Sequence, residues 1–152
     1  MADVLFYHLE HKSWTDVLPR QLATSVERGW RCVVQVKDPQ RLEEISELLW
    51  NADADVFLAH GTPADGRAGE QPIWLTAENE NPNMATVKFF VEGAEADDLA
   101  GLVRAVVLFD GRDAAAVARA RDDWKRLKSE GHDISYYQQD ENLRWVKRAS
   151  TG

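Results

Sequence analysis

The chain has 152 residues, of which 44% are hydrophobic and 29% charged, and it carries a net charge of −8 at pH 7. This length fits one globular domain, which we expect to span residues 1–148, with a flexible tail at 149–152. The sequence has no long apolar run and no signal-peptide pattern, and Cys32 is its only cysteine, so we expect a cytoplasmic protein without a membrane anchor or disulfides. The negative net charge argues against direct binding of nucleic acid.

The predicted elements of the first part of the chain alternate between strand and helix. They are a strand at 4–9, a helix capped by Thr15 or Asp16 and running to about 28, a strand at 30–36, a helix from 39 to 50 and a short strand at 56–59. Gly29 is a suitable end for the first helix, and Asp38-Pro39 supplies a cap and a first-turn proline for the second.

The second part begins with a surface loop rich in glycine at 61–71. The elements expected after it are strands at 73–76, 86–91 and 105–109, a helix from 112 to 129 and extended segments at 134–138 and 143–146. Short apolar strands separated by amphipathic helices predict a three-layer α/β/α domain of Rossmann-like build with a mainly parallel sheet.

A nucleotide, cofactor or metal site is not expected in this fold. No strand is followed by a glycine-rich phosphate loop with its lysine, and His8 and His11 have no third metal ligand in view. Cys32 lies within an apolar strand, where a thiol is usually inert. His60 follows a strand, as active-site residues of α/β enzymes do, so a small enzyme with a site near His60 and the 61–71 loop remains the alternative function.

The last long helix is basic in an otherwise acidic chain. Residues 119–152 hold eight basic and six acidic residues, whereas residues 1–118 hold ten and twenty. Helical spacing brings five residues near one face: Val117, Arg121, Trp124, Lys125 and Lys128. Cations beside an indole suit a ligand that is both anionic and aromatic. The other interpretation is a buried stripe of Val117, Ala120, Trp124 and Leu127 with the cations solvated on its flanks.

Tryptophan is abundant, with six residues, and indole rings are enriched at protein interfaces. Core packing explains Trp30 and Trp74 well. Trp50 ends a helix next to a polar turn, and Phe57 follows shortly after it. Two aromatic residues around an exposed turn are compatible with a protein-binding patch.

Several motifs stand in the order and spacing of a known family. They are Phe6-Tyr7-His8-Leu9, Leu49-Trp50, Phe57-Leu-Ala-His60, the loop leading to Pro72-Ile73, Val106–Asp110 and Ala118-Arg-Ala-Arg121-Asp-Asp-Trp124-Lys125. On these residues, nearly the whole chain resembles the chi subunit of bacterial DNA polymerase III. The resemblance implies a Rossmann-like fold without a nucleotide, and a non-enzymatic accessory subunit of the clamp-loader assembly in DNA replication.

The resemblance also implies partners. The family grips the acidic C-terminal tail of single-stranded DNA-binding protein, which ends in a phenylalanine with a free carboxylate, and so links that protein to the clamp loader. The tail-binding residues would be Val117, Arg121, Trp124, Lys125 and Lys128, with Arg121 at the family's essential basic position. Trp50 and Phe57 match a second face, which receives the psi subunit or, in some bacteria, a repair helicase. This tail site requires Trp124 to be partly exposed, and it differs from many members in having Asp122 and Asp123 nearby.

Overall fold

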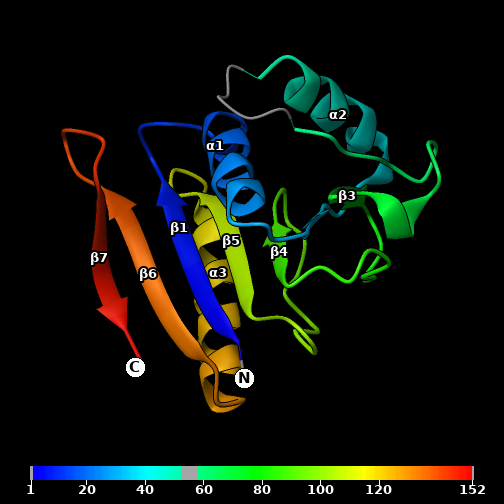
Figure 1. Cartoon of the computed structure of the whole chain (residues 1–152). Helices are drawn as coiled ribbons and strands as arrows, with labels where there is room; N and C mark the ends of the chain where they lie inside the picture. The colour runs from blue at the N-terminus through cyan, green and yellow to red at the C-terminus, as the bar shows by residue number, and fades with distance from the viewer. Residues whose placement is uncertain (1, 53–57, 152) are drawn as a thin grey trace.

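The computed structural model describes residues 2–52 and 58–151 (Figure 1). The helices are α1 (Trp14–Glu27), α2 (Leu42–Trp50) and α3 (Ala114–Ser129), with 3-10 turns at Pro39–Arg41 and Ala68–Glu70. The strands are β1 (Asp3–Leu9), β2 (Cys32–Gln35), β3 (Ile73–Thr76), β4 (Val87–Phe90), β5 (Arg104–Asp110), β6 (Asp133–Gln139) and β7 (Trp145–Ser150). In the described ranges, no helix is long and apolar enough to cross a membrane.

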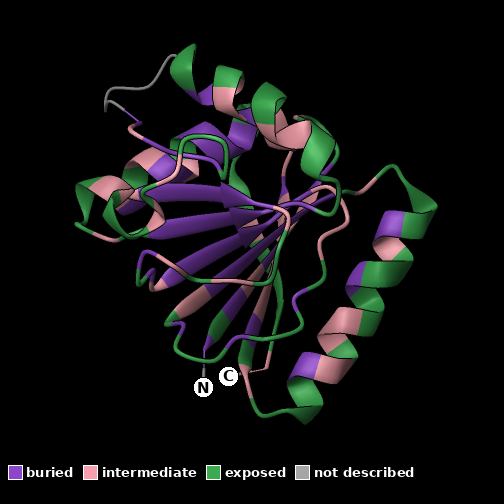
Figure 2. Cartoon of the chain, turned by 90° about the vertical axis from the view of Figure 1, so that its right-hand side faces the viewer, coloured by how far each residue is buried: buried purple, intermediate pink, exposed green. Residues whose placement is uncertain are grey.

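All seven strands form one sheet in the order β3-β2-β4-β5-β1-β6-β7, and only β7 runs antiparallel to its neighbour. One core cluster joins the sheet to α1 and α2, and a second joins the opposite face of the sheet to α3. Figure 2 shows the buried strands between these helical layers, with α3 alone on its side. The three-layer α/β fold with a mainly parallel sheet is therefore confirmed.

Alternation along β1 assigns its side chains to the two layers. Val4 and Phe6 are fully buried in the cluster under α3, whereas Tyr7 and Leu9 belong to the cluster under α1. Successive side chains of a strand point to opposite faces, so this pattern follows from the period of two. It places Phe6 beneath α3 and Tyr7 on the other side of the sheet.

The start of the second predicted helix is confirmed with its cap. The Asp38 carboxylate accepts a hydrogen bond of 2.9 Å from the backbone N–H of Gln40, and Pro39 occupies the first helical position. The first turn is a 3-10 turn, after which α2 continues to Trp50 as predicted. The other predicted helices agree with the structure to within about two residues at their ends.

The strand predicted at 56–59 is wrong where the structure describes it. Leu58 and Ala59 are not in a strand, and residues 56 and 57 lie outside the described residues. Of the described residues 58–61, only Gly61 pairs with β3, through an isolated bridge to Trp74. Leu58 is nevertheless 3% exposed. The apolar pattern there reflects burial of a side chain without strand pairing, a distinction that hydrophobicity does not make.

The last strand begins later and extends further than predicted. The Asp140 carboxylate accepts hydrogen bonds from the backbone N–H groups of Asn142 and Arg144, at 2.8 and 2.9 Å, so a turn precedes β7. β7 then runs to Ser150, which pairs with Ser135. Pairing with β6 therefore continues into the segment 149–152 that we expected to be a flexible tail.

The N-terminus of α3 provides a test of how this helix is stabilised. The Asp113 carboxylate accepts hydrogen bonds from the backbone N–H groups of Ala115 and Ala116, at 3.0 and 3.4 Å. We expect Asp113→Ala to lower the free energy of unfolding by about 1 kcal/mol, because it removes an N-cap. Urea denaturation measures this loss. Asp122→Ala, on the exposed surface of the same helix, is the control and should change stability by less than half as much.

Candidate functional site

The basic helix α3 is held to the sheet by small and aliphatic residues. Ala116, Ala120 and Leu127 are all buried, at 8, 5 and 0% exposure, and they pack in the cluster that contains Phe6 and Ile134. Exposed residues such as Ala118, Arg121 and Lys125 lie away from this stripe and face solvent. The structure reconciles the two interpretations of this helix, because a buried stripe and an accessible cationic face coexist on it.

Trp124 lies at the boundary between that core and solvent. It is half-buried, and its ring centroid lies 5.9 Å from that of Phe6 and 6.1 Å from that of Tyr136. Val117 is half-buried about two turns earlier on the helix. A tryptophan fixed from below by two aromatic rings, with part of its surface accessible, offers a rigid apolar platform at low entropic cost. This is the degree of exposure that a tail site requires.

Arg121 is exposed and stands next to this platform. Burial raises the pKa of the Tyr136 hydroxyl, the positive charge of Arg121 opposes that rise, and Glu10 adds to it. Arg121 precedes Trp124 by three residues on α3, so the two side chains are neighbours on the surface of the helix. The structure thus brings together a cation and two aromatic rings, from α3 and β6.

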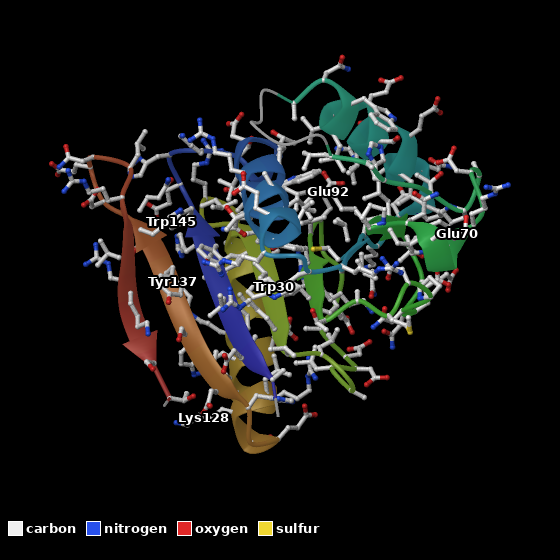
Figure 3. The ribbon with its side chains drawn as sticks, in the orientation of Figure 1. Trp30, Glu70, Glu92, Lys128, Tyr137 and Trp145 are labelled. Atoms are coloured by element: carbon white, nitrogen blue, oxygen red, sulfur yellow. The ribbon has the colours of Figure 1, made fainter. Side chains whose placement is uncertain are left out.

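Lys125 and Lys128 continue the basic surface toward the end of α3, and both are exposed. Figure 3 shows Lys128 in the last part of the helix, close to the lower end of the sheet. From Val117 to Lys128 the helix rises by about 16 Å. We use the name α3 face for the set Val117, Arg121, Trp124, Lys125, Lys128 and Tyr136.

The two aspartates beside this face are directed elsewhere. The Asp123 carboxylate lies 3.2 Å from the guanidinium of Arg126, which also donates to the backbone carbonyl of Ala96 at 2.9 Å. Asp122 lines a different cavity, between α3 and the end of β5. In the described parts of the chain, Arg121, Lys125 and Lys128 form no ion pair, so their charges remain available to an anionic ligand.

A hydrogen-bonded network fixes the position of Tyr136, a residue that the sequence did not single out. The Tyr136 hydroxyl bonds to Nδ1 of His8, and Nε2 of His8 lies 2.7 Å from the Glu10 carboxylate. A neutral His8 ring satisfies both contacts if the Tyr136 hydroxyl donates to Nδ1 and the Nε2–H group donates to Glu10. A Cβ at Gly111 would lie 1.9 Å from Nε2, so the His8 ring in this position needs a glycine there. The position of Tyr136 depends on tertiary structure, because β1 and β6 are parallel neighbours and Tyr136 is in register with Phe6.

The second predicted face is described only in part. Trp50 is 52% exposed at the end of α2, and its ring centroid lies 4.2 Å from that of His60. Phe57 lies outside the described residues. The structure therefore gives the position of one of the two aromatics that were expected to form this face.

His60 has partners, which the sequence did not reveal. It is 6% exposed, Nδ1 lies 2.8 Å from the carbonyl oxygen of Leu58, and Nε2 lies 2.8 Å from the Ser46 hydroxyl. The carbonyl requires Nδ1 to be the donor, so the Ser46 hydroxyl donates to Nε2. Both nitrogens are satisfied inside the protein, and the buried ring supports the exposed Trp50. These contacts suit a structural histidine that fastens α2 to the segment before β3.

The single cysteine is inert in the way its apolar strand predicted. Cys32 is fully buried in β2. Burial raises the pKa of its thiol to about 12, although a side-chain hydrogen bond from Ser25 opposes the shift. A thiol with this pKa stays protonated at neutral pH and is a poor nucleophile.

Comparison with known proteins adds two findings. The family model described as "DNA polymerase III chi subunit, HolC" matches residues 1–135. The chain is also similar to a protein of Rickettsia prowazekii (strain Madrid E) named "Probable DNA polymerase III subunit chi", with 26% identity over 87 residues. That match covers 57% of this chain and 53% of the relative, so it spans about half the length of each. The basic helix, Phe6 and Ile134 lie within the matched family region, and Tyr136 is the first residue after it.

Proposed function

Because the chain belongs to the family of DNA polymerase III chi subunits, we propose that it acts in DNA replication by binding the acidic C-terminal tail of single-stranded DNA-binding protein on its α3 face. Tail binding would link that protein to the clamp loader. The observation that carries the proposal is the juxtaposition of Arg121 with the half-buried rings of Trp124 and Tyr136.

The chemistry of the face fits each part of such a tail. A terminal phenylalanine ring packs on the accessible edge of Trp124 beside Val117, which removes apolar surface from water. Its free carboxylate, and the aspartates before it, pair with Arg121 and Lys125, which have no ion-pair partner in the described parts of the chain. Lys128 lies one turn further on and suits a more distant aspartate. Because the net charge of the chain is −8, the rest of its surface would repel an acidic tail. The cations of the α3 face would therefore also direct the tail to this site.

The second face extends the proposal to the clamp loader itself. Trp50 is exposed on the helix α2 and is held from below by His60. Exposed tryptophans fixed in this way are typical anchors of protein interfaces. We assign this face to the psi subunit or an equivalent partner, such as a repair helicase, and Phe57 would extend it.

The alternative, an enzyme with a site near His60 and the 61–71 loop, has less support. The Ser46 hydroxyl does donate to His60, but Ser46 lies within α2, where the backbone N–H groups are bonded along the helix. Such N–H groups cannot stabilise an oxyanion next to the serine. The same contact is explained by the support of Trp50.

A labelled peptide tests the tail-binding proposal directly. We expect Asp-Asp-Ile-Pro-Phe with a free C-terminus to bind with a dissociation constant in the micromolar range, about −8 kcal/mol, in a fluorescence anisotropy titration. Binding should weaken as salt rises from about 0.05 to 0.5 M, because part of the attraction is between exposed charges. The C-terminal amide of the same peptide should bind about tenfold more weakly, because it lacks the carboxylate that pairs with Arg121.

The matched control is a peptide with the same residues in which phenylalanine is moved to the N-terminus. It keeps the charge and loses the terminal ring, so it should bind at least tenfold more weakly. Equal binding of all three peptides would show a non-specific electrostatic contact and would refute the site.

A further inference from the structure

The face of the sheet opposite α3 carries a row of aromatic side chains. α1 lies over β5 and β2, and within the described residues no helix covers β6 and β7 on this side (Figure 1). The Tyr7 and Tyr137 rings are stacked with centroids 5.1 Å apart, and the Trp145 ring meets Tyr7 edge-on at 4.8 Å. Figure 3 shows Trp30, Tyr137 and Trp145 along this same side of the sheet.

A cavity continues this row toward α1. It has a volume of about 360 Å³, and its apolar floor is formed by strand residues such as Leu5, Phe89 and Val106. Its walls carry Tyr7, Trp145, Trp30 and three arginines, which are Arg20, Arg28 and Arg104. Volumes of this order accommodate one planar group of a ligand.

The charge of the cavity is opposite to that of the chain. None of the described residues that line it is acidic, and its three guanidinium groups form no ion pair within residues 2–52 and 58–151. Asp3 is the neighbour of Arg104 in register on β1, yet its carboxylate makes no ion pair with it. The cavity is therefore locally positive, although the net charge of the chain is −8.

Trp30 and Arg104 link the cations to the aromatic rings. The guanidinium carbons of Arg28 and Arg104 lie 5.0 and 5.2 Å from the centroid of the Trp30 ring. The Nε of Arg104 is buried and has no hydrogen-bond partner among the described residues. A buried donor of a charged group without an acceptor is costly, and an anionic ligand in the cavity would supply acceptors. Trp30, which we expected in the core, is only half-buried and is part of this site.

The dimensions favour a polymer over a small anion. A lone phosphate would bind the arginines and make no contact with the aromatic rings. Lys147 stands 5.8 Å from the Tyr137 ring centroid, so cations accompany the aromatic row as far as β7. Neighbouring strands are about 4.8 Å apart, so the row from β5 to β7 is about 14 Å wide, more than one nucleotide needs. Cations that alternate with exposed or partly exposed rings on an open sheet are the features that bind phosphates and unstacked bases.

We propose that this cationic–aromatic face, made of Arg20, Arg28, Trp30, Arg104, Tyr7 and Trp145, binds a short segment of single-stranded DNA. The phosphates lie on the arginines and the bases stack on the accessible surfaces of Trp145 and the half-buried Trp30, on the side of the sheet opposite the α3 face. Duplex DNA does not fit, because its bases are already stacked on each other. This binding is separate from capture of the protein tail and does not depend on it.

A fluorescent oligothymidylate tests this proposal on the full chain in low salt. We expect saturable binding that weakens steeply with salt. The double variant Arg20→Glu/Arg28→Glu changes two cations at exposed positions and should weaken binding at least about tenfold, with a smaller salt slope. Trp145→Ala should also weaken it about tenfold, because it removes a stacking surface. The charge-matched control, Arg112→Glu/Arg119→Glu, alters exposed arginines outside this face and should change affinity less than threefold.

Three outcomes distinguish binding at this face from a general attraction between charges. Arg121→Ala should leave oligothymidylate binding unchanged while it weakens the tail peptide, so the two proposals succeed or fail independently. Equal loss in both charge-reversed doubles would overturn the site in favour of a non-specific charge effect. Competition by free thymidine monophosphate at the concentration at which the oligonucleotide competes would also overturn it, because a mononucleotide would then be the ligand.

Discussion

Arg121→Ala is expected to weaken binding of the acidic tail peptide by about 2 kcal/mol, roughly thirtyfold, without loss of stability. The guanidinium is exposed and forms no ion pair in the described parts of the chain, so its removal leaves the fold intact. In a complex it would be the cation next to the Trp124–Tyr136 platform, where the ligand carboxylate and ring must come together. Titration of wild type and variant with the same labelled peptide, beside their urea denaturation curves, measures both effects.

Arg119→Ala is the matched control for this experiment. Arg119 is exposed on the same helix, and it lines the cavity between α3 and the end of β5 instead of the α3 face. The net charge of the two variants is identical, so a non-specific electrostatic effect would be equal in both. Affinity that stays at the wild-type value in Arg121→Ala would remove the residue from the site. Arg121→Lys should recover only part of the affinity, because an ammonium does not pair with a carboxylate in the bidentate way of a guanidinium.

The helical half of the candidate site was predictable because it depends on local periodicity. Spacing alone placed Arg121, Trp124 and Lys125 near one another, and Ala120 and Leu127 on the side that faces the sheet. Tyr136 was not predictable in this way. It joins Trp124 only because β6 lies beside β1 in parallel with Phe6 opposite Tyr136, and strand order is a long-range property.

The prediction of the fold succeeded where each element buries a continuous apolar stripe. The parallel strands β2, β4 and β5 are mostly apolar because both of their faces are covered. It failed at Leu58, where a buried residue is not part of a strand, and it was displaced at β7, which is mostly exposed. An edge strand with one solvated side gives a weak hydrophobic signal, and its position is set by the Asp140 turn and by pairing with β6.

The net charge of the chain did not predict the cluster of cations at the cationic–aromatic face. The acidic total argued against contact with nucleic acid, a prediction that the oligothymidylate titration tests, whereas Arg20 and Arg28 come from α1 and Arg104 from β5. These residues are far apart in the sequence, and only the packing of α1 on the sheet gathers them around Trp30. Local potential, and not net charge, decides which ligand a surface attracts.

Phe6→Ala is expected to lower the free energy of unfolding by about 4 kcal/mol, because it empties the space of a fully buried ring. For a chain of this size the loss corresponds to a melting temperature lower by roughly 10 °C. Calorimetry or a thermal melt followed by circular dichroism measures it. Phe6 is also the ring on which Trp124 rests, at 5.9 Å between centroids. Its removal should let the indole sink toward the cavity, so the tail peptide should bind at least fivefold more weakly at a temperature where the variant is fully folded.

Phe89→Ala separates these two consequences. Phe89 is 1% exposed, but it packs in the cluster under α1, on the other side of the sheet from α3. The two variants should be destabilised to a similar degree, because each loses one buried benzyl group. Only Phe6→Ala should weaken the tail peptide, since only Phe6 supports Trp124. If both variants bound the peptide equally weakly, general loosening of the fold would explain the loss, and support of Trp124 by Phe6 would not be needed. If both variants bound the peptide as tightly as the wild type, the position of the Trp124 indole would not matter for tail binding.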